Sequence, residues 1–402
     1  MPCKTQLIWG KSPKELRQTT LSDRPKGLIQ TVGSNPLPLL ISAATLKPEK
    51  SIMLYSRQTE SVTERLYELY KNLGIKSKKV LIEDPKSTEE CAKVVTPDMG
   101  DYHLDYTGGT KVMSCGVRSK WLQHGGTPDR CCYVDNRSEE LRFDDGETVP
   151  INLLITLDTK IKLHGFELLE KRPELGRGPK LSDGAVIAQE ALKGDFNSYK
   201  SKLGRIAAKV PMDSSDTTPL KPNDFGLKLS QNQIHPKMKS ITRSTWKDFF
   251  KGKWLEYWIA YLIAKLEKEE PMRIHAGVSV GTAGGGSFEL DVIGIRRHKT
   301  YVISCTTDSK PSEAKMKLFE VYMRARQMGG TLARSAIVAG LDWAEEGDGS
   351  IHDRVEDLEE VARRAWDSPN SPKVFGLRHM REWAGIGISE PNLSSLKKWL
   401  SR

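Results

Sequence analysis

The tract FELDVIGIRRHKTYVISCTT holds two carboxylates whose spacing suits metal chemistry. Glu289 and Asp291 are two residues apart, so in a strand both side chains project from the same face. A hairpin that turns at Arg297-His298 would place Asp291 opposite Ser304 on the returning strand. Packing explains two carboxylates among Val and Ile poorly, whereas Mg²⁺ and Mn²⁺ require hard oxygen ligands. We therefore predict a metal site on this hairpin; an exposed strand face is the alternative.

Charged side chains on the two flanking helical segments could extend this site. Glu256 lies inside the apolar segment DFFKGKWLEYWIAYLIAKLEKE, where a carboxylate is either solvated or directed at a site. Lys317, Glu320 and Arg324 follow the hairpin at i, i+3 and i+7, which places them on one helical face. That face is either an ordinary row of surface ion pairs or a Lys and a Glu that reach the same centre.

The first half of the chain alternates short apolar strands with amphipathic helices. The pattern predicts strands at residues 27–32, 51–56, 79–83, 102–106 and 131–134. It predicts helices at 37–46, 89–95 and 110–123, and one after the second strand with Val62, Leu66, Leu69 and Tyr70 at helical spacing. Such alternation is typical of a mainly parallel sheet with helices on both faces. A doubly wound sheet ordered 3-2-1-4-5 makes the first and fourth strands neighbours.

Two polar loops follow those two strands. Gly33-Ser34-Asn35-Pro36 comes after the first, and Thr107-Gly108-Gly109-Thr110-Lys111 after the fourth. Ligands bind beyond the carboxyl ends of the strands where the order reverses. Small residues, backbone N–H groups and a helix N-terminus suit phosphate there, and Lys111 adds a positive charge. The alternative is that Gly and Pro only shape tight turns.

Composition limits the class of protein. The chain has 402 residues, with 62 Lys and Arg against 52 Asp and Glu, a net charge of +10 that suits a polyanionic partner or simple solubility. Six cysteines without a CxxC pair predict free thiols in a reducing compartment. MPCKTQLIWGKSPKELR lacks a signal-peptide core, and no 18-residue apolar run occurs, so we expect a cytoplasmic protein without a membrane helix.

Three regions are expected. Residues 1–150 form the Rossmann-like domain. Residues 151–240 form an extension and linker, with strands at 151–155 and 161–168, weak helices at 185–192 and 199–210, and then a Pro- and Ser-rich linker or long loop. Residues 241–402 form the domain with the acidic hairpin, followed by helices at 353–365 and 393–401.

VGSNPLPLLISAATLKPEKSIMLYS and LDYTGGTKVMS together resemble the CARF domain (CRISPR-associated Rossmann fold) of type III CRISPR ancillary proteins. The resemblance implies a homodimer that binds cyclic oligoadenylate, with cyclic tetra-adenylate favoured, across the dimer axis. The residues it assigns to the ligand are Gly33, Ser34, Asn35, Pro36, Thr107, Gly108, Gly109, Thr110 and Lys111.

GKWLE, FELDV and KLFEVYMRARQMGG, in that order, resemble the PD-(D/E)xK nuclease half of CARF-containing CRISPR endonucleases. The resemblance implies that Mg²⁺ or Mn²⁺ is held by Glu256, Glu289 and Asp291. Ser304 and Thr306 occupy the Glu and Lys positions of the ExK signature, so an active enzyme must find those charges elsewhere. Lys317 and Glu320 are the candidates.

Two functions remain open from the sequence. The first is a cyclic-oligoadenylate-gated nuclease acting on DNA, RNA or both in antiviral defence, with Glu256, Glu289, Asp291, Ser304, Thr306, Lys317 and Glu320 at its centre. The second is an inactive nuclease-fold protein that serves as a sensor or sink for the ligand. The retained carboxylates argue for the first function, and the substitutions at Ser304 and Thr306 argue for the second.

Overall fold

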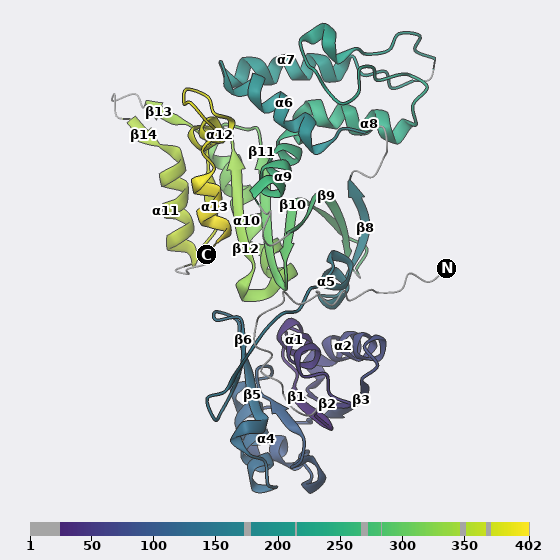
Figure 1. Cartoon of the computed structure of the whole chain (residues 1–402), viewed down its shortest axis with the longest axis vertical. Coiled ribbons are helices and arrows are strands. Elements are labelled where there is room, and N and C mark those ends of the chain that lie inside the picture. Colours follow the sequence, from purple (N-terminus) through teal and green to yellow (C-terminus); the bar gives the residue numbers. More distant parts are fainter. Residues whose placement is uncertain are drawn as a thin grey trace. The chain divides into compact units, whose positions relative to one another are not determined.

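The computed structural model describes residues 25–172, 178–213, 215–266, 272–282, 284–345, 351–366 and 371–401. The chain forms two compact units that divide at Glu167/Leu168, with the short stretch Thr282–Gly285 grouped with the first unit. Each unit contains its own sheet (Figure 1). The N-terminal segment, including Cys3, lies outside the described residues. Within the described ranges, no helix is both long and apolar enough to span a bilayer.

The sheet of the first unit has the strand order β3-β2-β1-β4-β5-β6-β7. The first five strands are parallel: β1 (Gly27–Thr31), β2 (Lys50–Tyr55), β3 (Lys76–Leu81), β4 (His103–Asp105) and β5 (Cys131–Asp135). The strands β6 (Glu140–Phe143) and β7 (Thr148–Pro150) extend it antiparallel. The predicted order 3-2-1-4-5 is confirmed, and the added hairpin is new.

Helices cover both faces of this sheet. One core includes α1 (Leu37–Leu46), α2 (Glu60–Asn72) and part of α5 (Leu157–Leu163), and the other includes α3 (Thr88–Lys93) and α4 (Lys111–Gln123). Adjacent Cys131 and Cys132 are buried in different cores, as alternation along a strand requires. The five described cysteines are free thiols, as predicted.

The predicted strand at residues 151–155 is wrong, and the one at 161–168 agrees with the structure only over residues 166–168. Ile151, Leu153 and Ile155 alternate and are buried, but the chain there forms no ladder. Thr156 then caps α5 by accepting a hydrogen bond from the backbone N–H of Thr159. The alternation of apolar residues correctly indicated burial, but it does not show whether another strand is available to pair with this segment. A strand, β8 (Phe166–Arg172), follows α5.

The sheet of the second unit has the order β15-β12-β11-β10-β9-β8. Antiparallel pairing joins β9 (Arg273–Thr282), β10 (Ser287–Arg296) and β11 (Lys299–Thr306). Parallel pairing joins β11, β12 (Arg334–Ala339) and β15 (Lys373–Phe375). The helix α10 (Pro311–Gly329) connects β11 to β12 and packs on both. A separate pair, β13 (Trp343–Glu345) and β14 (Ile351–Asp353), is antiparallel.

A helical layer belongs to the same unit. It contains α6 (Leu181–Leu192), α7 (Phe196–Ala208), α8 (Ser240–Asp248) and α9 (Trp254–Leu266), which lie together in Figure 1. The segment after α7 is an irregular long loop, but its Leu220, Leu227 and Ile234 are buried in this core, so it is no free linker. Residues 151–240 are thus shared between the two units.

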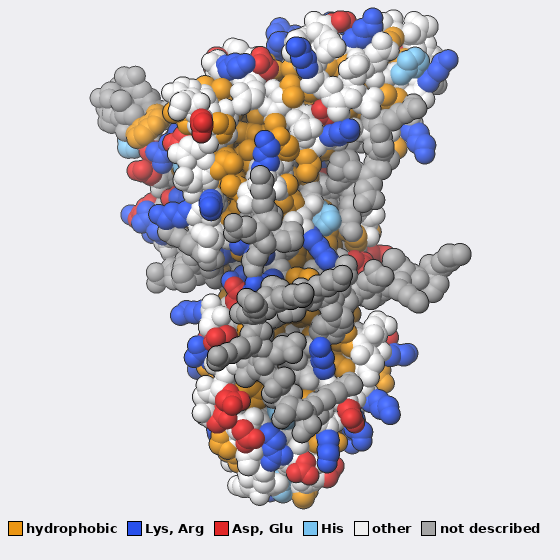
Figure 2. Space-filling model, in the orientation of Figure 1, with side chains coloured by type: hydrophobic (Ala, Val, Ile, Leu, Met, Phe, Trp, Pro, Cys, Tyr) orange, Lys and Arg blue, Asp and Glu red, His pale blue; other side chains and the backbone are white. Residues whose placement is uncertain are grey.

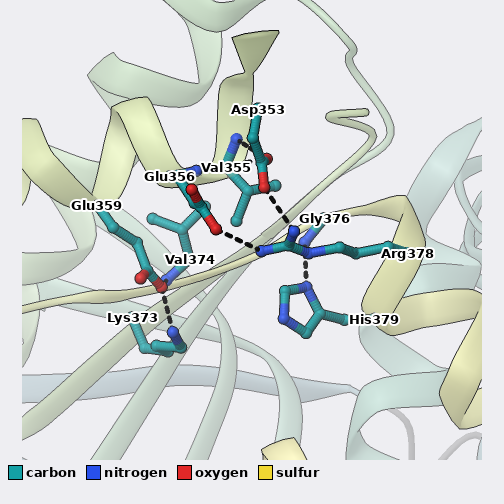
Figure 3. Close-up of polar contacts among 9 residues, drawn as sticks. All are labelled: Asp353, Val355, Glu356, Glu359, Lys373, Val374, Gly376, Arg378 and His379. Atoms are coloured by element: carbon teal, nitrogen blue, oxygen red, sulfur yellow. Dashed lines mark hydrogen bonds and ion pairs between the residues drawn. The ribbon is translucent and has the colours of Figure 1, made fainter. Parts of the chain in front are cut away.

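The C-terminal helices are α11 (Arg354–Trp366), α12 (Leu377–Ala384) and α13 (Ser394–Leu400). Polar contacts connect α11 with β15 and α12 (Figure 3). Asp353 accepts a hydrogen bond from the N–H of Val355 at the start of α11 and also pairs with Arg378 of α12. Glu359 of α11 pairs with Lys373 of β15. This edge of the sheet, including β15 and α12, was not predicted.

Candidate functional site

A pocket of about 200 Å³ lies between β10, β11 and α10. It gathers five of the predicted centre residues from segments that are separate in the sequence. The residues that line it are Glu289, Leu290, Asp291, Val302, Ile303, Ser304, Lys317, Glu320, Val321 and Arg324. The hairpin and the following helix therefore meet at one place, as the sequence predicted. Glu256 and Thr306 do not line the pocket.

The hairpin geometry fixes one oxygen of Asp291. Arg296 pairs with Lys299, which confirms the turn at Arg297-His298. The Ser304 hydroxyl donates to Asp291 Oδ2 at 2.9 Å, and the backbone N–H of Cys305 donates to the same oxygen at 2.7 Å. No other hydrogen bond to this carboxylate comes from the described part of the chain. Its Oδ1 is therefore available on a side chain that lines the pocket.

Burial raises the pKa of Asp291 above its usual value. The N–H of Cys305, the ammonium of Lys317 and the Ser304 hydroxyl all act in the opposite direction, and the charge of Glu289 adds to the rise. A cation in the pocket would favour the ionised form, because it interacts with the negative charge that burial disfavours. Asp291 thus has the environment of a carboxylate that gains from a positive ligand.

Glu256 and Thr306 are placed differently from the pocket residues. Glu256 is buried on α9, and its charge, like that of Asp291, adds to the rise that burial causes in the pKa of the Cys305 thiol. Its carboxylate is therefore close to the Cys305 side of β11. Thr306 is buried, and its hydroxyl accepts a hydrogen bond from the N–H of Asp308. Thr306 thus shapes the end of β11 and brings no charge to the pocket.

The pocket's donors fit a magnesium-type ion. Glu289, Asp291 and Glu320 offer hard carboxylate oxygens. Across the described ranges, no group of three or more His, Cys, Asp or Glu side chains is placed to hold a metal ion. Mg²⁺ commonly uses only one or two carboxylates and completes its shell with water and substrate phosphate. The donors fit that open kind of site and not a closed structural one.

The face of α10 with Lys317, Glu320 and Arg324 contains a surface ion pair and also lines the pocket, so both alternatives for its sequence pattern occur together. Arg324 Nε lies 3.8 Å from the Glu320 carboxylate, which is a surface ion pair, and its guanidinium lies 4.0 Å from the centre of the Phe288 ring. The same residues also line the pocket with Lys317. Phe288 and Arg324 therefore hold the helix face against β10 while leaving charged groups at the pocket.

The two polar loops of the first unit lie against each other, as predicted. The Thr31 hydroxyl donates to the carbonyl of Gly108 at 2.7 Å. A Cβ on Gly33 would lie 2.8 Å from the backbone nitrogen of Gly109, and a Cβ on Gly108 would lie 2.1 Å from the carbonyl oxygen of Thr31. Only glycine allows this approach. Both loops therefore end at one place beyond β1 and β4.

The side chains of these loops divide into internal and outward groups. Thr107 bonds Asp105 and the N–H of Val134, and Thr110 caps α4 by accepting from the N–H of Met113. Asn35 accepts from the N–H of Leu37, and Pro36 is buried. Ser34, Thr110 and Lys111 are exposed. The outward groups that could meet an anion are thus Ser34, Lys111 and the loop backbone.

A buried polar network beneath the loops was not predicted. Asp105 has no exposed surface and accepts hydrogen bonds from Gln30, Ser42 and Thr107. Tyr70 donates to Gln30 and to a backbone carbonyl of α1. Burial raises the pKa of Asp105, and the hydrogen bonds oppose that rise. The sequence signal that could have revealed this network is one polar residue in each of two buried strands, Gln30 in β1 and Asp105 in β4.

No family model matches the sequence, and no curated protein matches it. Solved structures do match. Can2 from Sulfobacillus thermosulfidooxidans, in complex with cyclic tetra-adenylate, superposes with a TM-score of 0.62 at 17% identity, over 93% of this chain and 99% of that one. The chain has the fold of Can2. This result confirms the predicted α/β fold class with a Rossmann-like and a nuclease-type module.

Two further structures agree. Protein VC1899 from Vibrio cholerae gives a TM-score of 0.64 at 12% identity, over 93% of this chain and 98% of that one. A type III CRISPR defence DNA nuclease activated by cyclic oligoadenylate gives 0.51 at 17% identity, over 91% of this chain and 55% of that one. Identities this low compare folds, so the chemistry of the pocket rests on its own residues.

Proposed function

We propose that the chain is a nuclease of type III CRISPR defence that requires a divalent metal and is activated by cyclic oligoadenylate. The pocket between β10, β11 and α10 carries the proposal, because it collects acidic and basic side chains from two strands of a nuclease-type sheet and from the helix that packs on it. The substrate is DNA, RNA or both, and the active form is a homodimer. The fold shared with Can2 and with a nuclease activated by cyclic oligoadenylate supports this choice.

The activator site is proposed at the paired loops of the first unit. Exposed Ser34 and Lys111 and the backbone N–H groups beside Gly33 and Gly109 suit the phosphates of a cyclic oligonucleotide. Cyclic tetra-adenylate is the favoured ring, because Can2 holds that ligand and shares this fold.

The pocket residues would have different roles in phosphodiester hydrolysis. Asp291 and Glu289 would hold Mg²⁺ or Mn²⁺, which when bound polarises the phosphate and makes a water more acidic. Lys317 and Arg324 would offset negative charge on the phosphate from the α10 side. Glu320 would supply the carboxylate of the signature Glu. Ser304 cannot supply it, and its hydroxyl instead orients Asp291.

Asp291→Ala tests the catalytic part of this proposal. We expect cleavage of plasmid and single-stranded RNA or DNA, with Mn²⁺ and cyclic tetra-adenylate, to fall at least about 100-fold, as loss of a metal ligand in hydrolysis implies. Ligand affinity should stay unchanged. Asp224→Ala, an exposed aspartate outside the pocket, is the matched control. Full cleavage by Asp291→Ala would remove this pocket as the catalytic site.

A ligand sensor or sink without nuclease activity is the second candidate. Ser304 and Thr306 favour it, because neither supplies the charges of the signature and Thr306 does not line the pocket. Tight binding of cyclic tetra-adenylate by the wild-type chain, with no cleavage of any of the nucleic acids under Mg²⁺ or Mn²⁺, would select this candidate.

A further inference from the structure

Lys253 is a positive charge at the nuclease-type hairpin that the sequence pattern did not single out as part of the site. It is the last residue of the kinked segment Phe249–Lys253, directly before α9. Its ammonium contacts the carboxylate of Glu289 on β10 at 2.5 Å. Glu289 lines the pocket, so this ion pair joins the helical layer to the proposed metal site.

The backbone before Lys253 has an unusual shape. Gly252 has non-helical backbone angles, with φ of +154°, which residues with a side chain rarely adopt. The chain therefore kinks at Gly252, between α8 and α9, directly before Lys253. Lys253 contacts a strand residue that comes 36 residues later. The kink therefore coincides with a contact to the pocket.

The two hairpin carboxylates have different partners. Asp291 receives hydrogen bonds from neutral donors, the Ser304 hydroxyl and the Cys305 N–H. Glu289 pairs with an ammonium, and both side chains are partly shielded, with 23% of Lys253 and 34% of Glu289 exposed. A divalent cation that binds Glu289 must therefore share or displace the ammonium that is hydrogen-bonded to it, whereas the nearby Lys317 acts on Asp291 only through its charge.

We infer that Lys253 is a positioning residue that holds Glu289 by an ion pair and competes with a divalent cation for its carboxylate. The inference rests on the proposed function in one respect, that the pocket is where the cation binds. It goes further by assigning to Lys253 the control of metal affinity. Lys253 belongs to the segment before α9 and pairs with Glu289. Lys317 belongs to α10, and its charge lowers the pKa of Asp291.

Binding of Mn²⁺ alone to the full chain, without nucleic acid, tests this inference. Free Mn²⁺ is measured by electron paramagnetic resonance for the wild type, Lys253→Met and Lys251→Met. We expect Lys253→Met to bind Mn²⁺ at least about fivefold more tightly, because removing one positive charge near the ion removes about 1 kcal/mol of competition. Lys251 is exposed in the same segment, and its variant should match the wild type.

Equal or weaker Mn²⁺ binding by Lys253→Met would overturn the inference. Lys253→Arg, which keeps the charge, should retain the wild-type affinity, and melting temperatures of all variants verify folding. If the wild type binds no Mn²⁺ at the pocket, the inference requires that Lys253→Met gains binding that Asp291→Ala then abolishes. Absence of that gain also overturns it.

Failure of the proposed function gives a different pattern. A chain that never cleaves nucleic acid, but whose Mn²⁺ affinity rises with Lys253→Met and falls with Asp291→Ala, keeps the Lys253 competition and loses the nuclease. A chain that cleaves, but shows no effect of Lys253→Met on Mn²⁺ affinity, keeps the nuclease and loses the competition.

Discussion

At the residue scale, Asp105 is the side chain on which the proposed ligand loops depend most. Asp105→Ala removes the acceptor for Gln30, Ser42 and Thr107 in a site without solvent. We expect the free energy of unfolding to fall by about 2–4 kcal/mol, because buried donors are left unsatisfied. Urea unfolding measures this loss. Asp98→Ala, on an exposed aspartate, should change stability little; an equally small effect for Asp105→Ala would show that the network is dispensable.

Lys111 supplies the residue-scale prediction for the activator. It is exposed at the first position of α4, beside the paired loops. Lys111→Ala should weaken cyclic tetra-adenylate binding about tenfold, since a charge-assisted bond to phosphate is worth about 1.5 kcal/mol or more. Isothermal titration calorimetry compares it with Lys120→Ala, in the last turn of the same helix. Unchanged affinity for Lys111→Ala would move the ligand away from these loops.

Single residues were predictable where a short-range rule fixed them. The pairing of Asp291 with Ser304 followed from the turn residues, because hairpin register propagates from the turn. Helix spacing placed Lys317 and Glu320 on one face, and the pocket joins that face to Glu289. The Lys253–Glu289 contact could not be predicted, since it depends on a kink at Gly252 that no composition pattern marks. Glu256 was foreseen as a ligand, and that role stays a prediction.

At the element scale, the kinked segment Phe249–Lys253 is the feature that a substitution can test most directly. Gly252→Ala introduces a side chain at a positive φ, and we expect a loss of about 1–3 kcal/mol in the free energy of unfolding. The loss should be accompanied by altered Mn²⁺ affinity, because Lys253 is the next residue. Gly204→Ala in α7, where an added Cβ meets nothing, is the control and should be neutral or stabilising. Stability unchanged by Gly252→Ala would indicate that the turn is relaxed.

Elements were predictable where periodicity and tertiary pairing agreed. The helix at residues 37–46 and the five parallel strands have both, and the structure confirms them. The segment at 151–155 has the alternation of a strand, but it is buried without a ladder. The strand β15 and helix α12 are short. They depend on contacts between residues that are distant in the sequence, such as that of Asp353 with Arg378 (Figure 3). Local sequence does not carry such contacts.

At the scale of the whole molecule, the chain carries a net charge of +10, and Figure 2 shows one face of it. Lys and Arg side chains there are interspersed with acidic and hydrophobic ones. The excess of basic residues was visible in the composition, but their distribution over the surface required the structure.

Three histidines make stability depend on pH in both units. Burial lowers the pKa of His103 to about 4 and of His164 to about 3 in the first unit, and of His379 to about 4 in the second. His379 Nδ1 also accepts a hydrogen bond from the N–H of Gly376, which protonation would abolish (Figure 3). Because each folded pKa lies below the unfolded value of about 6.5, the unfolded chain binds more protons between these limits. Stability therefore falls as the pH drops below about 6.5.

His379→Gln isolates one of these contributions. Each histidine can remove up to about 1.4 kcal/mol per pH unit from the free energy of unfolding, so the melting temperature of the wild type should fall between about pH 7 and pH 5. Carboxyls with raised pKa, such as those of Asp105 and Asp291, act in the opposite sense, and the difference between variant and wild type cancels them. In calorimetry, His379→Gln should flatten the pH dependence of the second unit alone. An equally steep fall in wild type and variant would mean that His379 is protonated in the folded chain as readily as in the unfolded one.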